Sequence, residues 1–162
     1  MSENCTTITI RRENLLFKVG NAARIVKDSI PDEDKTHEMR RWVEDILDDG
    51  NSERVTDLLD LAFADILEWM DTHLQDVDTE GDVDVDEDDD YIFRVSARLG
   101  AHKAILKPRF EEYMVAYVLW QWLLHKGFES QAAPWLAEME LMREKVRDVI
   151  NGGRMKRPMS PF

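Results

Sequence analysis

Residues 110–124 read FEEYMVAYVLWQWLL, and this stretch decides the fold. Its apolar side chains would cover most of the circumference of a helix rather than one face. Pro108 suits the first turn of such a helix, and Gly127 suits the position just after its end. A helix that is apolar on most sides belongs in the centre of a bundle or at a subunit interface, because those sides must be covered. We therefore predict a helix from Pro108 to about Gly127 with neighbours around it.

Four further segments carry apolar residues at the spacing of one helical face. They cover residues 15–26, 39–47, 55–74 and about 134–150. The third has the most regular pattern, an almost unbroken series of three- and four-residue steps, and Asn51 or Ser52 is available as its N-cap. Together with the apolar helix, these segments predict about five helices.

Two short segments, residues 6–10 (TTITI) and 91–95 (YIFRV), are rich in β-branched and aromatic side chains. Such runs are typical of strands. We expect the two to pair with each other and to lean on the helices, since two strands alone are marginally stable. Residues 96–107 give mixed signals and are assigned to no element. The predicted fold class is mainly α: a single-domain helical bundle with a short two-stranded β element.

Length and composition favour one domain. The chain has 162 residues, of which 43% are hydrophobic and five are tryptophan, and this is enough for a single core. We predict a helical domain over residues 1–153, interrupted by an acidic loop at residues 76–90, and a basic flexible tail at residues 154–162. No apolar run is long enough to span a bilayer and no export signal is visible, which favours a cytoplasmic protein that does not enter a membrane.

The acidity of the chain is local. The formal net charge is −13, and residues 76–90 hold ten acidic residues and no basic one, so −13 less the −10 of this run leaves −3 for the rest. A concentrated acidic run indicates a solvated loop, a cation site or a docking surface for a basic partner.

Part of the acidic run matches the ligand pattern of a calcium-binding EF-hand loop. The five candidate ligands are Asp76, Asp78, Glu80, Asp84 and Glu87, with Gly81 at the turn. The exiting helix of an EF-hand is missing, because three aspartates and the strand-like YIFRV follow, and the chain has no second copy of the motif. We interpret the run as a solvated loop and keep a calcium site as the alternative. We expect no other cofactor.

Motifs of catalysis are not found in the sequence. The four histidines fall on separate predicted elements, and the chain lacks the glycine-rich phosphate loops and the nucleophile turn that announce nucleotide or acyl chemistry. Cys5 lies near a terminus that we expect to be mobile, a poor place for a nucleophile. We therefore predict that the protein is not an enzyme.

Two groups of residues are candidates for contacts with other molecules. The first is the aromatic set Tyr113, Tyr117, Trp120 and Trp122, which suits either the core or a subunit interface, since interfaces are enriched in tyrosine and tryptophan. The second is Arg154, Lys156 and Arg157 in the tail. Three positive charges suit an acidic partner surface and do not directly support nucleic acid as the partner.

The order of segments resembles a known class of proteins. A TITI-like N-terminal segment, amphipathic helices, a polar insertion, YIFRV, FEEYMVAYVLWQWLL, a final helix and RPMSPF follow one another. This layout resembles that of small helical proteins in prophage structural modules of Bacteroidetes. More distantly, it is similar to tailed-phage head-tail connector proteins.

The resemblance implies a structural role in virion assembly, in which helical subunits form a ring between the capsid portal and the tail. It implies protein–protein interaction with portal or tail components, a homo-oligomer, and a location in a phage-like particle. It points to the aromatic set as core or subunit-contact positions and to residues 154–162 as a docking arm. Two alternatives stay open: an acidic partner-binding module such as a nucleic-acid mimic, and a calcium-binding protein.

Overall fold

The computed structural model of the protein describes residues 5–70 and 90–152. In chain order its elements are β1 (Cys5–Ile10), α1 (Arg12–Ser29), the 3-10 turn η2 (Asp34–Thr36), α2 (His37–Glu44), the 3-10 turn η3 (Asp45–Leu47), α3 (Asp49–Trp69), β2 (Tyr91–Ser96), α4 (Ala97–Gly100), α5 (Lys103–His125) and α6 (Glu129–Ile150). The predicted class, a mainly α bundle with a short two-stranded element, is confirmed.

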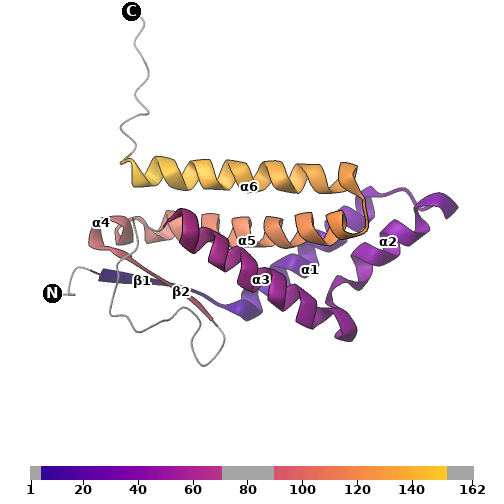
Figure 1. The fold of residues 1–162 in the computed structure, drawn as a ribbon, viewed down its shortest axis with the longest axis horizontal. Coiled ribbons are helices and arrows are strands. Elements are labelled where there is room, and N and C mark those ends of the chain that lie inside the picture. The colour runs from indigo at the N-terminus through magenta and orange to yellow at the C-terminus, as the bar shows by residue number, and fades with distance from the viewer. Residues whose placement is uncertain (1–4, 71–89, 153–162) are drawn as a thin grey trace, which may run out of the picture.

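The central element is α5. In Figure 1, α6 runs along one side of α5, α3 crosses in front of it and α1 passes behind it. Its buried residues lie all around the helix, from Leu106 and Phe110 to Trp122 and Leu123. The prediction that residues 110–124 lie in the centre of a bundle is therefore confirmed.

Two polar contacts show that α1 and α3 pack on opposite faces of α5. The Lys18 ammonium of α1 lies 3.1 Å from the buried carboxylate of Glu111. Two positions further along α5, the Tyr113 hydroxyl donates a hydrogen bond to Asp65 of α3. Two residues correspond to about 200° around a helix, so the contacts point in nearly opposite directions.

The two strands pair as expected. β1 and β2 are antiparallel, with Ile8 opposite Phe93 and Ile10 opposite Tyr91. Burial alternates along β2, and its buried residues face the helices. Phe63 of α3 packs on this face, with its ring centroid 4.9 Å from the rings of both Tyr91 and Phe93. The helices thereby supply the support that an isolated pair of strands lacks.

Three helices begin earlier than predicted. α3 starts at Asp49 with Asp48 as its N-cap, so Asn51 and Ser52 lie inside the helix. α5 starts at Lys103 and α6 at Glu129, so Pro108 and Pro134 lie inside the helices rather than at their starts. Each proline is the sixth residue of its helix, past the first turn, and so removes one intrahelical backbone hydrogen bond. Residues 96–107, which the sequence left unassigned, form the end of β2, the short α4 and the first turn of α5.

The predicted end of the central helix is correct. Gly127 has a φ of +80°, which glycine adopts without strain. Its N–H donates to the Leu124 carbonyl over 2.9 Å, and the Phe128 N–H donates to the Leu123 carbonyl over 3.1 Å. These two bonds form a Schellman motif, which satisfies carbonyls at the end of α5 and turns the chain toward α6.

Several predicted features lie outside the described residues. They are the end of the third helical stripe at Leu74, the candidate calcium ligands Asp76, Asp78, Glu80, Asp84 and Glu87, and the tail residues Arg154, Lys156 and Arg157. Within residues 5–70 and 90–152, no helix combines the length and apolar content needed to cross a lipid bilayer.

Candidate docking groove

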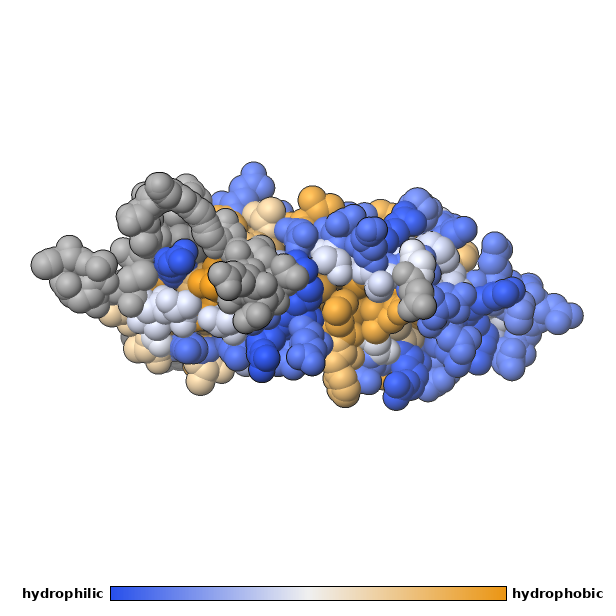
Figure 2. Space-filling model, turned by 90° about the horizontal axis from the view of Figure 1, so that it is seen from below, coloured by the Kyte–Doolittle hydropathy of each residue, from blue (hydrophilic) through white to orange (hydrophobic). Residues whose placement is uncertain are grey.

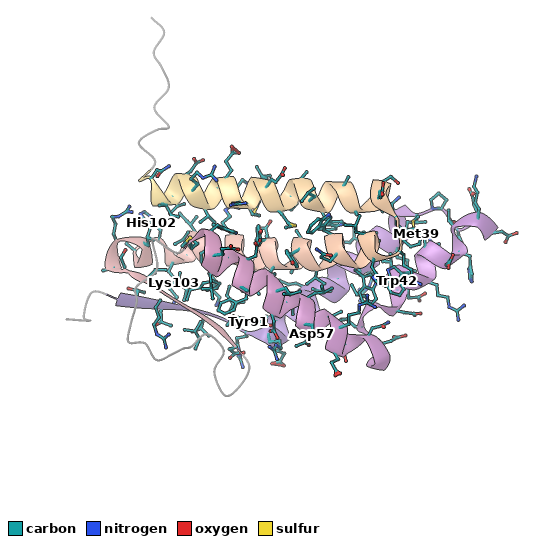
Figure 3. All side chains as sticks on the ribbon, in the orientation of Figure 1. Met39, Trp42, Asp57, Tyr91, His102 and Lys103 are labelled. Atoms are coloured by element: carbon teal, nitrogen blue, oxygen red, sulfur yellow. The ribbon has the colours of Figure 1, made fainter. Side chains whose placement is uncertain are left out.

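A reciprocal tryptophan pair joins α2 to the end of α5. The indole N–H of Trp42 donates to the Trp122 carbonyl over 2.7 Å, and the indole N–H of Trp122 donates to the Trp42 carbonyl over 2.9 Å. The two rings stack with centroids 4.3 Å apart. Both carbonyls lie in last turns, where backbone acceptors lack intrahelical donors, so each indole caps the other helix. Trp42 projects from α2 toward this end of α5 in Figure 3.

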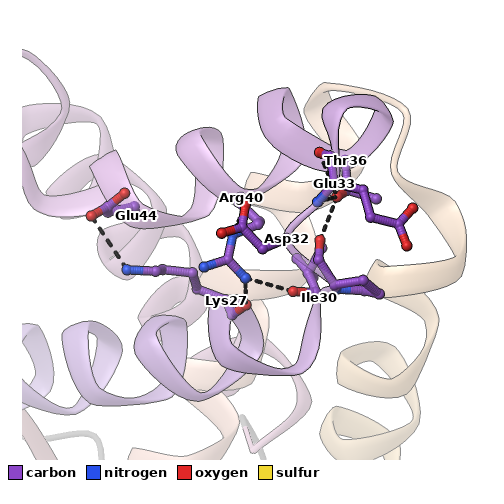
Figure 4. A network of polar contacts seen from close by, with 8 residues as sticks. Lys27, Ile30, Asp32, Glu33, Thr36, Arg40 and Glu44 are labelled. Carbon is purple, nitrogen blue, oxygen red and sulfur yellow. Dashed lines mark hydrogen bonds and ion pairs between the residues drawn. The ribbon is translucent and has the colours of Figure 1, made fainter.

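Arg40 fixes the other side of α2. Its guanidinium donates to the carbonyls of Lys27 and Ile30 at the end of α1, over 3.1 Å and 2.5 Å. Lys27 in turn lies 3.4 Å from the Glu44 carboxylate (Figure 4). A cation near the carbonyl end of a helix is also favoured by the helix dipole. The short helix α2 is therefore held at the C-terminal ends of both α1 and α5.

A broad surface of α5 forms the floor of an open groove beside α3 and α6. The groove consists of two hollows, of about 310 Å³ and about 240 Å³, that share Gln121. The α5 floor carries Tyr113, Tyr117, Trp120, Gln121, Trp122, Leu124 and His125, the α3 side carries Arg54, Leu58 and Asp65, and the α6 side carries Leu136, Met139, Glu140 and Arg143. We call this set the α5 groove.

The helical spacing of the floor explains why these side chains gather. Tyr113, Tyr117, Trp120 and Leu124 follow one another by four, three and four residues, so they share one face of α5. Glu111, which contacts α1, lies on the opposite face. Tyr117 and Trp120 are half-buried, and Leu124 and Leu136 remain 37% and 36% exposed. The groove is thus an amphipathic surface left open to solvent.

Hydrogen bonding and burial set the chemistry of its phenols. Burial, followed by the hydrogen bond to Asp65, raises the pKa of Tyr113 above its usual value. Burial also raises the pKa of Tyr117, with Asp65 adding to the effect. Both phenols are therefore protonated at neutral pH, where a tyrosine acts as a hydrogen-bonding apolar surface rather than as a nucleophile.

A second tryptophan closes one end of the groove. The Trp69 ring meets the Tyr113 ring edge-on, with centroids 5.5 Å apart. The Arg143 guanidinium lies 5.3 Å from the centre of the Trp69 ring, a cation–π contact between α6 and α3. This contact links the two walls across α5 and orders Arg143 at the rim.

The charged side chains that line the groove are balanced in sign. The α3 side carries Arg54 and Asp65, and the α6 side carries Glu140 and Arg143. Asp60 of α3 pairs instead with Arg12 and accepts a hydrogen bond from the Tyr91 hydroxyl. The lining therefore suits an amphipathic partner segment that carries charges of both signs.

One pair of carboxylates lies outside the groove. Burial raises the pKa of Glu138 on α6, and the hydrogen bond that its protonated carboxyl donates to Glu112 on α5 raises it further. Lys145 and Arg109 act in the opposite direction. Neither glutamate lines the groove, and the pair is part of the contact between α5 and α6.

The structure divides the predicted aromatic set. Tyr113 and Trp122 are 3% and 1% exposed and belong to the core of this chain. Tyr117 and Trp120 are half-buried and reach the groove. The core interpretation therefore describes Tyr113 and Trp122, and only Tyr117 and Trp120 present appreciable surface to another molecule. Arg154, Lys156 and Arg157 are not among the described residues.

The sequence patterns did not single out the walls of the groove. Leu58, Leu124 and Leu136 belong to helical stripes that equally suit a core, and nothing in the sequence states which stripe remains uncovered. One feature of the sequence did point to an exposed surface on α5: its apolar side chains cover a wider arc than one neighbouring helix can bury.

Within residues 5–70 and 90–152, no cluster of three or more histidine, cysteine, aspartate or glutamate side chains has the geometry to hold a metal ion. Comparisons of the chain with protein-family models, with curated proteins and with solved structures found no match.

Proposed function

We propose that this protein is a non-enzymatic assembly protein that docks other protein chains through the α5 groove, in the manner of a connector or adaptor of a phage-like particle. The observation that carries the proposal is the groove itself: an aromatic floor between two helices, with Leu124 on the floor and Leu136 on the α6 side left partly exposed. Grooves of this form receive amphipathic helices, which supply apolar anchors at helical spacing.

The chemistry of the groove supports binding rather than bond-making. A phenol is protonated at neutral pH, and burial moves the pKa values of Tyr113 and Tyr117 further above neutrality. Tyrosine and tryptophan contribute large contact area at low cost in side-chain entropy. The connector type of assembly comes from the resemblance in segment order and remains part of the proposal.

Co-purification tests this function. A tagged full-length chain is expressed together with the proteins encoded beside its gene. We expect portal, capsid or tail components to be retained, and we expect the retained amount to fall in the groove variant Leu124→Lys/Leu136→Lys, because it places ammonium groups in the docking surface. A second variant that ends at Asn151 tests the contribution of the tail.

Ile105→Lys is the matched control, since Ile105 is 45% exposed on α5 and lies outside the groove. It should behave as wild type. If no neighbouring gene product is retained, or if those neighbours encode no particle components, the assembly function is overturned.

A further inference from the structure

The two hollows of the α5 groove differ in charge. The smaller, of about 240 Å³, has donor groups and apolar walls, and none of the described carboxylates lines it. Its lining consists of Arg54, Leu58, Gln121, Trp122, Leu124 and His125. The larger, of about 310 Å³, contains Asp65 and Glu140 beside Arg143. We call the smaller one the His125 hollow.

Arg54 of α3 is the cation of the His125 hollow, and two contacts hold it in place. One of its guanidinium nitrogens lies 2.9 Å from Nδ1 of His125. Because an arginine side chain only donates, Nδ1 is the acceptor and the proton of the neutral imidazole is on Nε2. The guanidinium carbon lies 5.6 Å from the centre of the Trp122 ring, a cation–π contact. A planar group of N–H donors is thereby ordered at the hollow.

Most donors of Arg54 remain available to another molecule. The hydrogen bond to His125 uses one of the several N–H groups of the guanidinium. Among the described residues, no carboxylate forms an ion pair with Arg54. Glu53 and Asp57 precede and follow it on α3, but neither lines the hollow. The acceptor that matches a guanidinium best is a carboxylate, which takes two parallel N–H···O bonds.

The end of α5 does not oppose an anion here. A helix C-terminus normally presents carbonyls without donors, and these repel negative charge. The Trp122 carbonyl accepts the indole N–H of Trp42, and the carbonyls of the next two residues accept N–H groups of the turn after α5. The Lys126 ammonium, 4.7 Å from the centre of the Trp42 ring, adds a second positive charge beside the tryptophan pair. The groups at this end of the groove therefore favour an anion over a cation.

The size of the hollow suits one side chain of a docked helix. An α-helix with its side chains is about 10 Å wide, so about 240 Å³ cannot hold a whole helix. Leu124 at this hollow lies four residues after Trp120, which corresponds to about 6 Å along α5. A helix that lies along the groove with an apolar residue over Trp120 therefore presents a residue one turn away to the His125 hollow.

The hollow lies at the α2 end of the groove, because Trp122 in its lining stacks on Trp42 of α2. The molecular surface changes in the same direction. Figure 2 shows hydrophobic side chains near the middle of the lower face and a hydrophilic surface at the end that α2 forms. A partner that lies along the molecule would thus pass from apolar to polar surroundings toward α2.

We propose that the His125 hollow binds the carboxylate of an aspartate or glutamate on the docked partner helix, one helical turn from the partner's apolar anchor. Arg54 and the amide of Gln121 donate hydrogen bonds to this carboxylate. The contact fixes the direction of the partner in the groove, because Arg143 in the other hollow already stands beside Asp65 and Glu140. The inference rests on the proposed function, because it names the chemistry of the segment that the groove receives.

Selection from a peptide library tests the proposal. Amphipathic helices with randomised positions are displayed as internal segments of a carrier protein, so that only side chains supply carboxylates. Groove binders are those retained by wild type and not by Leu124→Lys/Leu136→Lys. We expect them to be enriched in aspartate or glutamate one turn from an aromatic or aliphatic anchor.

Charge exchange in one selected peptide is the sharpest arm, with fluorescence anisotropy as the measure of affinity. Arg54→Glu should weaken binding by about tenfold or more, because it sets a carboxylate against that of the peptide. Changing the acidic residue of the peptide to lysine should weaken binding to wild type and restore binding to Arg54→Glu. Lys103→Glu makes the same change of charge at the exposed start of α5 and should bind as wild type does (Figure 3). Circular dichroism checks that every variant is folded.

Three results overturn the inference and leave docking through the groove intact: groove binders without an acidic preference, unchanged binding by Arg54→Glu, or no restoration by the lysine peptide. A library that yields no groove binder also overturns it. The proposed function is judged separately, since it is overturned only when co-purification with neighbouring gene products fails.

Discussion

Trp42 and Trp122 each cap the helix of the other. Their ring centroids are 4.3 Å apart and the ring planes differ by 10°. Each indole N–H donates a hydrogen bond to the backbone carbonyl of the other tryptophan. The Lys126 ammonium lies 4.7 Å from the centre of the Trp42 ring on the open side. One stacked pair thereby joins two helices that are 80 residues apart in the chain.

Replacing Trp42 with phenylalanine tests the capping bond. Trp42→Phe keeps an aromatic ring for stacking and removes the N–H that satisfies the Trp122 carbonyl. We expect the free energy of unfolding to fall by about 1 kcal/mol or somewhat more, the usual effect of one hydrogen bond to a partly buried group. Denaturant titration measures it. Trp135→Phe, at another half-buried tryptophan, is the control, and equal losses in both variants would argue against the capping role.

Phe63 should be a main contributor to stability. It is 4% exposed and its ring contacts Tyr91 and Phe93 of β2. Phe63→Ala leaves a cavity between α3 and the sheet and should cost about 3 kcal/mol or more in unfolding free energy. Phe17→Ala removes the same ring from a site that is 63% exposed and should change little. An unchanged melting temperature in Phe63→Ala would show that the contact between α3 and the sheet is misassigned.

The pair formed by Lys18 and Glu111 joins α1 to the buried side of α5. Lys18→Met leaves the buried Glu111 carboxylate without its partner and should lower the free energy of unfolding by about 1–2 kcal/mol. The loss is smaller than for a fully buried pair, because Lys18 is half-exposed. The double variant Lys18→Met/Glu111→Gln should recover part of the lost free energy of unfolding, since the glutamine amide carries no charge. Lys27→Met, whose partner Glu44 is exposed, should cost at most about 0.5 kcal/mol.

Two buried tyrosines predict loss of stability in alkaline solution. Burial, and then hydrogen bonds to Asp60 and Asp65, raise the pKa values of Tyr91 and Tyr113 in the folded chain. A group whose pKa is raised by folding contributes its full stability below the unfolded pKa, near 10, and loses that stability as the pH rises above it. Stability should therefore fall by about 1.4 kcal/mol per pH unit for each tyrosine above about pH 10.

Urea titrations between pH 8 and 11 check this prediction. The double variant Tyr91→Phe/Tyr113→Phe is the comparison, because it keeps both rings and removes both phenols. It should start less stable than wild type, since Asp60 and Asp65 each lose a donor. Above about pH 10, its free energy of unfolding should decline less steeply with pH than that of wild type. Equal slopes for the two proteins would rule out the assigned role of the phenols.

Periodicity predicted most of the fold. The regular stripe at residues 55–74 predicted α3, and the β-branched runs predicted both strands and their pairing. These patterns are local, because each element must cover its own apolar face. The starts of α5 and α6 were misjudged because proline was taken as a first-turn residue, whereas both prolines lie past the first turn of their helices.

The groove could be predicted only in part. The breadth of apolar surface on α5 indicated that it needs several neighbours. The sequence did not distinguish Trp122, which is buried and stacks on Trp42 of α2, from Trp120, which is half-buried at the groove. Both belong to one apolar run, and their difference depends on where α2, α3 and α6 pack. The Trp42–Trp122 pair and the pairing of Arg40 with the end of α1 are likewise long-range contacts that leave no local pattern.

Hydroxyl-radical footprinting of the groove tests the central claim most directly. The oxidation of Trp120, Tyr117 and Leu136 is compared between the protein alone and the protein in complex with a partner retained in co-purification. Docking through the α5 groove predicts that oxidation of these three residues falls severalfold in the complex, while that of Ile105 stays the same. Equal oxidation of Trp120, Tyr117 and Leu136 in the two samples would contradict docking through this groove.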